Sequence, residues 1–448
     1  MGLSVEANEL ADYEREGAVL HRVLGLLRDA AGDPITLRVG GKSADDAYWE
    51  TPTTGAPSWV FEIGTDWLAQ LAALAHRDQL SVALDLNLAV HSPAMAASLA
   101  KAALAALGRS RLAGLAIGNE PDLFSDQPAL ERERVATTTS SARRGWTQEY
   151  TPARYRDDYL AYARALSVAA PGVALEGPEA ARANPAWLRA MTGLGRLGPR
   201  TITVHRYPLS YCWPSGSYFY PGVASLLAER SSHGLAGRLR GAIAIAHRSG
   251  QRLSVSEVNS VSCAGNAGVS DSFASALWAP DALFELIRAG VDAVNWHMRP
   301  QLLNAPFLLE RGSVQPLPEL YGLSLFSHMI GANARRLFLH VSSGRGLHLK
   351  VWAVRSASGT DVLLINKGPS RAVVSVSASR PPMGAAELER LWAPSALSTS
   401  GVTLAGRSIG TDGRWRGHLR HATVPPTTHG YRVSVPGFSA ALLTAAGL

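Results

Sequence analysis

The feature that most constrains the fold of this 448-residue chain is a repeated alternation of short apolar runs with stretches of helical spacing. This alternation is typical of parallel strands joined by crossover helices, because a parallel connection has to return to the other end of the sheet. Apolar, β-branched runs predict eight strands, at Leu3–Ala7, Ile35–Gly40, Leu80–Leu88, Leu112–Gly118, Val173–Glu176, Thr201–His205, Arg252–Ser256 and Val291–Trp296. Helical spacing predicts helices at Val19–Ala30, Trp67–His76, Met95–Leu107, Tyr155–Ala169, Pro185–Leu194, Ser225–Ser249, Ser272–Ala289 and Leu317–Met329.

Strands that alternate with helices in this number predict an α/β fold of the (β/α)8 TIM-barrel type. An open, doubly wound sheet is the alternative, because periodicity does not show whether a sheet closes. After Arg335 the chain changes to short alternating runs separated by Gly, Pro and Ser, which predicts a C-terminal β-sandwich. We therefore expect a catalytic barrel over residues 1–333 and a sandwich over residues 334–448, with a loop or insertion at Arg132–Arg144.

Charge and hydropathy exclude some classes of partner. The net charge of +7 rests on arginine, since 43 residues are basic and the only lysines are Lys42, Lys101, Lys350 and Lys367. The arginines are spread along the chain rather than clustered with aromatics, so no nucleic-acid partner is expected. No apolar run reaches the ~18–20 residues that span a bilayer, so no membrane partner is expected. The start, Met1–Leu10, has no basic-then-apolar leader, which predicts a cytoplasmic location by default, or a secreted one if this start is internal.

Polar residues follow several of the predicted strands directly, where a barrel of this type carries its working side chains. They are Arg38 and Asp45 at the second strand, Asn119 and Glu120 at the fourth, His205 and Tyr207 at the sixth, Glu257 at the seventh, and Trp296 and His297 at the eighth. Two glutamates across one barrel mouth are what glycoside hydrolysis requires, one as a proton donor and one as an ionised carboxylate. Their separation decides between retention and inversion, and the sequence does not give it.

Several of these motifs resemble the (β/α)8 retaining glycosidases of clan A and, more narrowly, glycoside hydrolase family 79, the heparanase and β-glucuronidase family. The resemblance covers essentially the whole chain, and it implies a barrel followed by a β-sandwich. It is carried by Leu37–Asp45, Gly118–Phe124, Ser256–Ser260, Gly268–Ser270, Phe273–Trp278, Gly401–Leu404 and Asp412–Trp415.

The resemblance also implies roles for individual residues. Glu120 would be the acid/base, Glu257 the nucleophile, Asn119 the partner of the sugar 2-hydroxyl, Arg38 and Tyr207 the residues that orient the nucleophile, Trp296 the floor under the sugar, and Asp45 a contact to sugar hydroxyls. For Trp296 the alternative is packing at the barrel rim. Lys42, His205, Glu176 and Glu179 are expected to serve only local structure.

The loop after the eighth strand departs from the family pattern. In glucuronidases of this family we expect a tyrosine and backbone amides to bind the substrate carboxylate, whereas His297–Asn304 contains no tyrosine. Arg299 would replace that partner with a charge-assisted bond. The alternative is that the loop binds no uronate and that the substrate is a neutral sugar.

Cys212 and Cys263 follow neighbouring predicted strands, so they either form a disulfide at the barrel face or remain two buried thiols. Two cysteines do not make a four-ligand zinc site, Gly40–Ser43 resembles a phosphate loop only superficially, and we expect no metal or cofactor. The sequence therefore predicts a retaining exo-β-glycosidase, a β-glucuronidase acting on a glucuronide or a uronic-acid-containing glycan. The alternatives are a glycosidase for a neutral sugar and a non-catalytic carbohydrate-binding barrel.

Overall fold

The computed structural model describes residues 1–28, 32–49, 60–125, 149–331, 334–342, 347–356, 359–377, 382 and 384–446. The expected insertion at Arg132–Arg144 and the expected domain boundary after residue 333 therefore lie outside the described residues. No helix among the described residues is long and apolar enough to span a bilayer.

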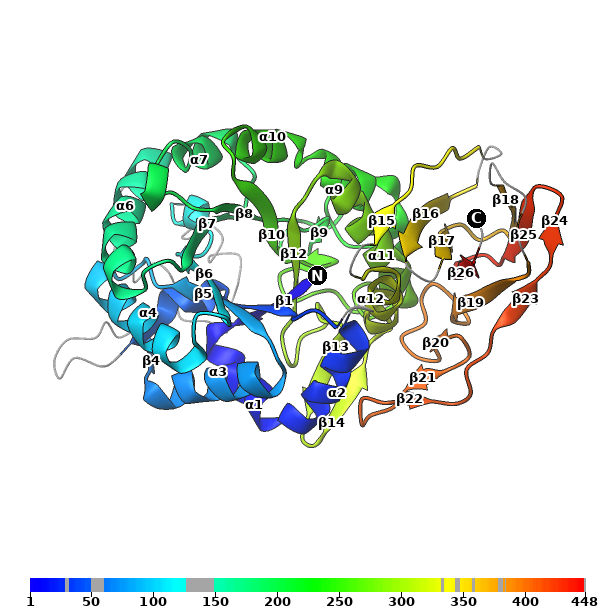
Figure 1. Ribbon diagram of the computed structural model, residues 1–448, viewed down its shortest axis with the longest axis horizontal. Coiled ribbons are helices and arrows are strands. Elements are labelled where there is room, and N and C mark those ends of the chain that lie inside the picture. The colour runs from blue at the N-terminus through cyan, green and yellow to red at the C-terminus, as the bar shows by residue number, and fades with distance from the viewer. Residues whose placement is uncertain are drawn as a thin grey trace.

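Eight parallel strands close into a barrel, which confirms the (β/α)8 prediction and shows that the alternative of an open sheet is wrong (Figure 1). Around the barrel the order is β1 (Gly2–Glu6), β12 (Ala293–His297), β10 (Arg252–Val258), β8 (Thr201–His205), β7 (Ala174–Ala180), β6 (Leu112–Ile117), β5 (Ser81–Leu86) and β2 (Thr36–Gly40). Each predicted strand therefore exists, with ends that differ by a few residues.

Helices cover the outside of the barrel (Figure 1). They are α1 (Leu10–Arg15), α2 (Gly17–Leu27), α3 (Thr65–Arg77), α4 (Pro93–Leu107), α6 (Pro152–Ala169), α7 (Pro185–Ala190), α8 (Val223–Leu227), α9 (His233–Gly237), α10 (Arg240–Arg248), α11 (Phe273–Ala289) and α12 (Pro318–Met329). Three of them begin with a capping side chain followed by proline, at Ser92, Thr151 and Asn184.

The prediction of a single helix over Ser225–Ser249 is wrong. The chain forms α8, a 3-10 turn at Glu229–Ser231, α9 and α10 in its place. The segment contains Gly234, Gly237 and Gly241, and glycine weakens a helix by about 1 kcal/mol relative to alanine. Short pieces that each pack on the barrel are the result.

The register of the barrel strands decides which side chains face inward. Ser4 pairs with Arg38 on one side and with His297 on the other, so these three side chains lie at one level inside the barrel. Two strands carry irregularities near their carboxyl ends, β7 between Gly177 and Ala180 and β10 between Val255 and Val258. Such bulges re-aim side chains, and each of these contains a glutamate described below, Glu179 in β7 and Glu257 in β10.

The C-terminal region consists of packed antiparallel sheets, as predicted. One sheet contains β15 (Arg335–Arg336), β16 (Leu349–Ser356), β17 (Gly359–Asn366), β26 (Ser439–Ala445), β19 (Ala386–Trp392), β20 (Thr403–Leu404) and β23 (Ala422–Val424). The other contains β18 (Ala372–Ser377), β25 (Gly430–Val435) and β24 (Pro426–Thr427), and a hairpin joins β21 (Ser408–Ile409) to β22 (Trp415–Arg416). Residues such as Leu364, Val433 and Leu443 fill the core between the two sheets.

The barrel and the sandwich share an interface built on α11 and α12, which lie between them (Figure 1). Trp352 of β16 stacks on Phe284 of α11 with ring centroids 5.3 Å apart. Its Nε1 donates to Asp281, which also forms a buried ion pair with Lys367 at 2.5 Å. An apolar stack and a desolvated ion pair therefore attach the sandwich to the barrel.

Candidate active site

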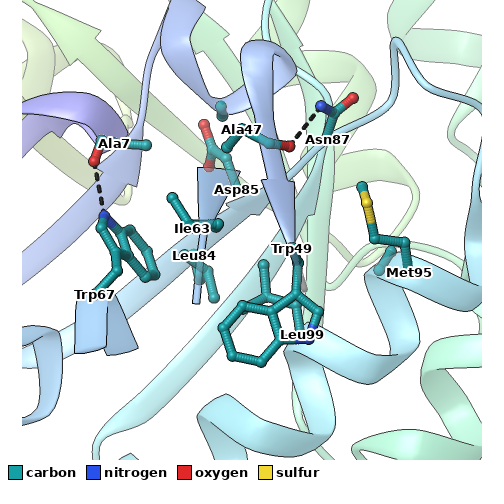
Figure 2. A pocket seen from close by; sticks show the side chains of 12 residues that line it. Ala7, Ala47, Trp49, Ile63, Trp67, Leu84, Asp85, Asn87, Met95 and Leu99 are labelled. Atoms are coloured by element: carbon teal, nitrogen blue, oxygen red, sulfur yellow. Dashed lines mark hydrogen bonds between the residues drawn. The ribbon is translucent and has the colours of Figure 1, made fainter. Parts of the chain in front are cut away.

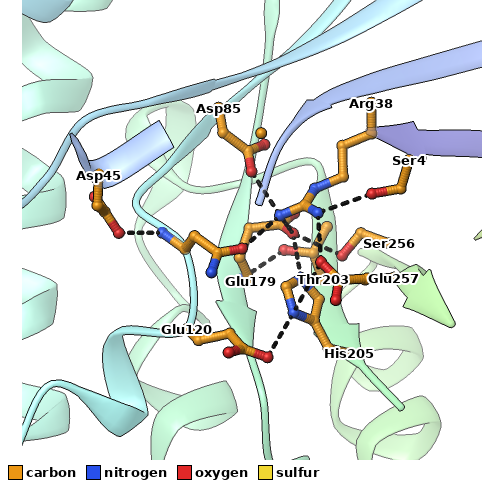
Figure 3. Close-up of polar contacts among 12 residues, drawn as sticks. Ser4, Arg38, Asp45, Asp85, Glu120, Glu179, Thr203, His205, Ser256 and Glu257 are labelled. Atoms are coloured by element: carbon orange, nitrogen blue, oxygen red, sulfur yellow. Dashed lines mark hydrogen bonds and ion pairs between the residues drawn. The ribbon is translucent and has the colours of Figure 1, made fainter. Parts of the chain in front are cut away.

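Glu120 and Glu257 meet at the mouth of the barrel, where β6 and β10 end (Figure 3). One carboxylate oxygen of each, together with a ring nitrogen of His205, lie within 4.8 Å of one another. The side chains of Glu120 and Glu257 are 25% and 12% exposed, so both reach solvent, whereas those of His205 and Arg38 beside them are 1% exposed. Glu120 adopts a left-handed backbone conformation (φ 48°), which places its side chain at the turn that leaves the strand.

Each oxygen of Glu257 has its own partner. Arg38 donates to Oε2 at 2.9 Å, and the Tyr207 hydroxyl donates to Oε1 at 2.7 Å. Burial alone would raise the pKa of Glu257, but the neighbouring imidazoles of His297 and His205, the charge of Arg38 and the Tyr207 bond hold it well below its usual range. Glu257 is therefore an ionised carboxylate in a fixed orientation, as a nucleophile requires.

Arg38 is the centre of the polar network inside the barrel (Figure 3). Its side chain is 1% exposed, and its guanidinium lies 2.6 Å from Asp85, 3.0 Å from Glu179 and 2.9 Å from Glu257. It also donates to Asn119 and to Ser4. Burial would lower the pKa of Arg38, but the three carboxylates raise it further above its usual value, so the group stays charged. Arg38 orients Glu257 from below and does not reach the mouth itself.

A hydrogen-bonded chain links Glu120 to a third glutamate. His205 bonds Glu120 through Nδ1 at 2.9 Å and Glu179 through Nε2 at 2.8 Å. Burial would lower the pKa of His205, but the charge of Glu257 and the bonds to Glu120 and Glu179 raise it to about 10. Despite its burial, the pKa of Glu179 is lowered to about 2 by Arg38 and His205 and by the hydroxyl of Ser256, 2.8 Å away. At neutral pH His205 is therefore an imidazolium that donates to both glutamates.

Asn119 and Asp45 lie near the mouth in different roles. The side-chain oxygen of Asn119 accepts from Arg38 at 2.8 Å, which leaves its NH₂ group to face a ligand. Asp45 is 1% exposed, and its two oxygens accept backbone N–H bonds from Leu88 and Asn119 at 2.8 and 2.9 Å. The expected contact of Asp45 with sugar hydroxyls is therefore not supported. This residue fixes the loop that carries Asn119.

The expected place of Trp296 under the sugar is wrong. Because His297 points into the barrel, Trp296 points outward, where it is 0% exposed and packs against Trp278 of α11 with ring centroids 5.3 Å apart. Its Nε1 donates to Glu319 of α12 at 2.9 Å. The inward position at this strand end belongs to His297, whose Nδ1 lies 3.7 Å from Glu257. Trp296 thus has the alternative role, packing between the barrel and its helices.

Arg299 lies on the loop after β12, and a carboxylate of this chain already binds it. Its Nε donates to Glu9 at 2.7 Å, and its Nη2 lies 2.5 Å from the same oxygen. Burial lowers the pKa of Arg299, but this bond and the charges of Glu6 and Glu9 raise it above its usual value. A substrate carboxylate would have to share or displace Glu9.

Cys212 and Cys263 form a disulfide, with Cα atoms 5.9 Å apart, so the alternative of two free thiols is wrong. The bridge joins the loops that follow β8 and β10. Two short strands in the same loops, β9 (Leu209–Ser210) and β11 (Val261–Ser262), pair in parallel beside it.

Asp85 and Ser256 were not among the residues predicted from the sequence, and His205 and Glu179 were expected to serve only local structure. Asp85 carried a usable signal, because it is an acid inside an apolar run and a buried arginine needs a partner. Glu179 did not, because its position depends on the irregularity in β7.

A second, mostly apolar pocket is lined by residues of β3 (Ala47–Trp49), β5, α3 and α4 (Figure 2). Trp49, Trp67 and Met95 line it, and Trp67 donates to the carbonyl of Ala7 at 2.9 Å. Asp85 of β5, which forms an ion pair with Arg38, is also one of the lining residues. Asp85 therefore belongs both to the lining of this pocket and to the polar network around Arg38.

Glu120, His205 and Glu257 are also close enough to hold a cation. Both ring nitrogens of His205 are already bonded to carboxylates, and Glu257 already holds Arg38 and Tyr207. A metal ion would have to break these bonds and compete with two protein cations. The residues present therefore do not fit a metal, and its expected absence stays a prediction.

No protein-family model and no curated protein sequence matches the chain. Several solved structures, however, match the chain in fold. The 4-O-α-L-rhamnosyl-β-D-glucuronidase of Fusarium oxysporum 12S superimposes with a TM-score of 0.75 at 15% identity, over 99% of this chain and 95% of that one. The GH51 arabinofuranosidase of Xanthomonas axonopodis pv. citri gives a TM-score of 0.64 at 15% identity, over 96% and 89%.

A GH30 endoxylanase from Clostridium papyrosolvens C71 gives a TM-score of 0.55 at 12% identity, over 100% of this chain and 96% of that one. All three similar structures are glycoside hydrolases by name. Similarity at this level of identity shows that the barrel and sandwich are arranged as in those enzymes. The chemistry has to be argued from the residues of this chain.

Proposed function

We propose that this protein is a retaining exo-β-glycosidase that hydrolyses β-D-glucuronides, with Glu257 as nucleophile and Glu120 as acid/base. The observation that carries the proposal is the approach of one Glu120 oxygen and one Glu257 oxygen to within 4.8 Å. Retaining enzymes place their carboxyl groups about 5–5.5 Å apart, whereas inverting enzymes leave about 6.5–9.5 Å for a water molecule. This closest approach of two single oxygens agrees with the retaining arrangement, and the stereochemistry of the azide products described below decides between the two outcomes.

In the first step Glu257 attacks the anomeric carbon, and Glu120 gives its proton to the departing oxygen. The C–O bond of the glycoside breaks, and a glycosyl ester forms on Glu257. In the second step Glu120, now ionised, takes a proton from water, which attacks the same carbon and restores Glu257. The Asn119 NH₂ group lies beside Glu120 and serves as the donor to the 2-hydroxyl. No cofactor takes part.

The glucuronide is supported by the motifs that resemble family 79 and by the similarity in fold to a rhamnosyl-glucuronidase. One observation favours a neutral sugar as a second candidate substrate. Arg299, the residue expected to bind the carboxylate, is already paired with Glu9. Glu9→Gln therefore separates the two substrates, because freeing Arg299 should improve KM for a glucuronide and leave KM for a neutral glycoside unchanged.

The test of mechanism is a panel of p-nitrophenyl β-glycosides, the glucuronide, glucoside, galactoside and xyloside, with the variants Glu257→Ala and Glu120→Ala. Azide should rescue Glu257→Ala with formation of the α-glycosyl azide, because azide then replaces the missing nucleophile. It should rescue Glu120→Ala with formation of the β-azide, because the ester on Glu257 remains. The same azide anomer from both variants would refute the assignment, and no turnover by the wild type would favour a carbohydrate-binding barrel.

A further inference from the structure

The loop of residues 206–222, between β8 and α8, carries aromatic side chains that are open to solvent. Tyr211, Trp213 and Tyr218 are 51%, 53% and 56% exposed. Trp213 and Tyr218 belong to one aromatic cluster, because both contact Phe219, with ring centroids 6.1 and 5.0 Å from its own and ring planes inclined to it by 39° and 88°. A patch of contiguous exposed aromatics is typical of a binding surface, whereas isolated exposed residues are common.

This loop is fastened to the strand that carries the nucleophile. Its second residue is Tyr207, whose hydroxyl bonds Glu257, and its β9 pairs with β11, which begins three residues beyond the end of β10. The Cys212–Cys263 disulfide adds a covalent link, and the N–H of Ser210 donates to the Phe219 carbonyl to close the loop on itself. The aromatic surface is therefore held in place before a ligand arrives, which lowers the entropic cost of binding.

Arginines accompany the aromatic surface. The guanidinium carbon of Arg230 lies 4.2 Å from the centroid of Tyr218, and that of Arg238 lies 5.7 Å from the centroid of Phe219. The two arginines flank Gly234, where an added Cβ would lie 3.6 Å from Arg230 Cβ and 3.7 Å from Arg238 Nη1. Arg230 donates to the Ser225 hydroxyl at 2.7 Å, but among the described residues no carboxylate pairs with either arginine, and the Nε atoms of both are buried without a hydrogen-bond partner.

Cations grouped in this way without a counter-charge favour an anionic ligand. Arg206 lies on the same loop, its pKa lowered to about 10 by burial and by the charge of Arg238. Like charges held together in partial burial repel each other, and a carboxylate placed between them would relieve the repulsion. Flat aromatic rings next to the cations supply apolar area for one face of a pyranose ring.

We propose that Trp213, Tyr218, Arg230 and Arg238 form a subsite that binds an acidic sugar ring on the leaving-group side of the substrate. The ring lies on the aromatic surface, and its carboxylate faces the guanidinium groups. This inference rests on the proposed function, because an exo-acting enzyme holds one sugar at Glu257 and leaves the rest of the glycan outside it. The preferred substrate is then an acidic oligosaccharide rather than a glucuronide of a small aglycone.

The experiment measures binding separately from hydrolysis. A hyaluronan hexasaccharide is titrated into the Glu257→Gln protein by calorimetry, beside the same hexasaccharide with its carboxyl groups reduced to alcohols. Trp213→Ala and Tyr218→Ala, each added to Glu257→Gln, should weaken binding of both ligands roughly five- to tenfold, because the stacking surface is lost. Arg230→Gln and Arg238→Gln should weaken only the acidic ligand, by about tenfold. Trp392→Ala, which removes an exposed aromatic of the sandwich, is the matched control and should change nothing.

Two outcomes would overturn the subsite. One is no binding of the acidic hexasaccharide to the parent Glu257→Gln protein, and the other is binding that the four substitutions leave unchanged. The four variants should keep the far-UV circular dichroism spectrum and the thermal unfolding midpoint of the parent protein, which shows that they fold. Failure of the proposed function would appear separately, as no turnover of any p-nitrophenyl glycoside by the wild type.

Discussion

Removal of one hydroxyl group, in Tyr207→Phe, tests whether the orientation and charge of Glu257 matter as the geometry indicates. The hydroxyl donates to Oε1 of Glu257 at 2.7 Å, while Arg38 holds Oε2. A hydrogen bond to a charged group contributes about 1.5–3 kcal/mol, and each 1.36 kcal/mol corresponds to a tenfold change. The whole bond corresponds to a factor of roughly 10 to 150, which is the upper bound on the fall in kcat/KM because the free enzyme makes this bond as well. We expect a result near the lower end, because Glu257 gives up its charge as it attacks.

The pH profile gives a second, independent reading of the same bond. The Tyr207 bond lowers the pKa of Glu257, so its loss raises that pKa. Ionised nucleophile is then lost at a higher pH as the solution becomes more acidic, and the acid limb of kcat/KM moves upward by up to about one to two pH units. The assay is release of nitrophenol from pH 3 to 9, with the glycoside that the wild type hydrolyses fastest.

Tyr431→Phe is the matched control. It removes a hydroxyl that donates to the Gly384 carbonyl at 2.7 Å in the sandwich, far from the barrel mouth in sequence and in fold. It should leave both the rate and the acid limb unchanged. If Tyr207→Phe also keeps kcat/KM within twofold and its acid limb in place, the claim that this bond positions and ionises Glu257 is refuted.

Three further predictions concern stability. The pKa of His205 is raised to about 10, so its stabilising charge is fully present below pH ~6.5 and is lost as the pH rises toward 10. Urea unfolding at pH 7, 8.5 and 10 should therefore show a fall in the unfolding free energy of the wild type that His205→Gln largely removes. An equal fall in the wild type and in the variant would contradict this prediction. Lys367→Met should cost up to about 3–5 kcal/mol in unfolding free energy, because buried Asp281 keeps only Lys350, 3.9 Å away, as a counter-charge. Adding Asp281→Asn should recover part of the loss, and no recovery would count against the ion pair as the cause. Replacing Cys212 and Cys263 by serine removes the cross-link between two residues that are 51 positions apart, and it should lower the unfolding free energy by up to about 4 kcal/mol. An unchanged midpoint of unfolding in urea would show that the disulfide does not constrain the unfolded chain.

The strands of the barrel were predictable because each is a compact apolar run flanked by turn residues. The same logic located Glu120 and Glu257, since a charged residue directly after such a run has to sit at the strand end, where the barrel opens. The sequence did not decide between a disulfide and two free thiols, because loop lengths alone do not tell how far apart two cysteines lie.

The wrong placement of Trp296 has a physical cause. Which face of a strand a residue occupies depends on the register with its neighbours, and the sequence of one strand does not give that register. Ser4, Arg38 and His297 share one level inside the barrel, so Trp296, next to His297, faces the helices. Asp45 lies in a 3-10 turn, and its carboxylate accepts backbone N–H bonds from Leu88 and Asn119, which are far away in sequence. These partners were therefore not visible in the residues around Asp45.

The network around Arg38 explains how one site can serve both chemical steps of the proposed reaction. In the resting enzyme the negative charge at the mouth is on Glu257; once the glycosyl ester forms, Glu257 is neutral and Glu120 carries the charge. His205 faces both, with Nδ1 2.9 Å from Glu120 and 3.7 Å from Glu257, and Glu179 anchors its other nitrogen. A single imidazolium therefore balances the charge in either state without moving, which is what electrostatic preorganisation requires. Arg38 cannot do this alone, because its described contacts reach Glu257 and not Glu120.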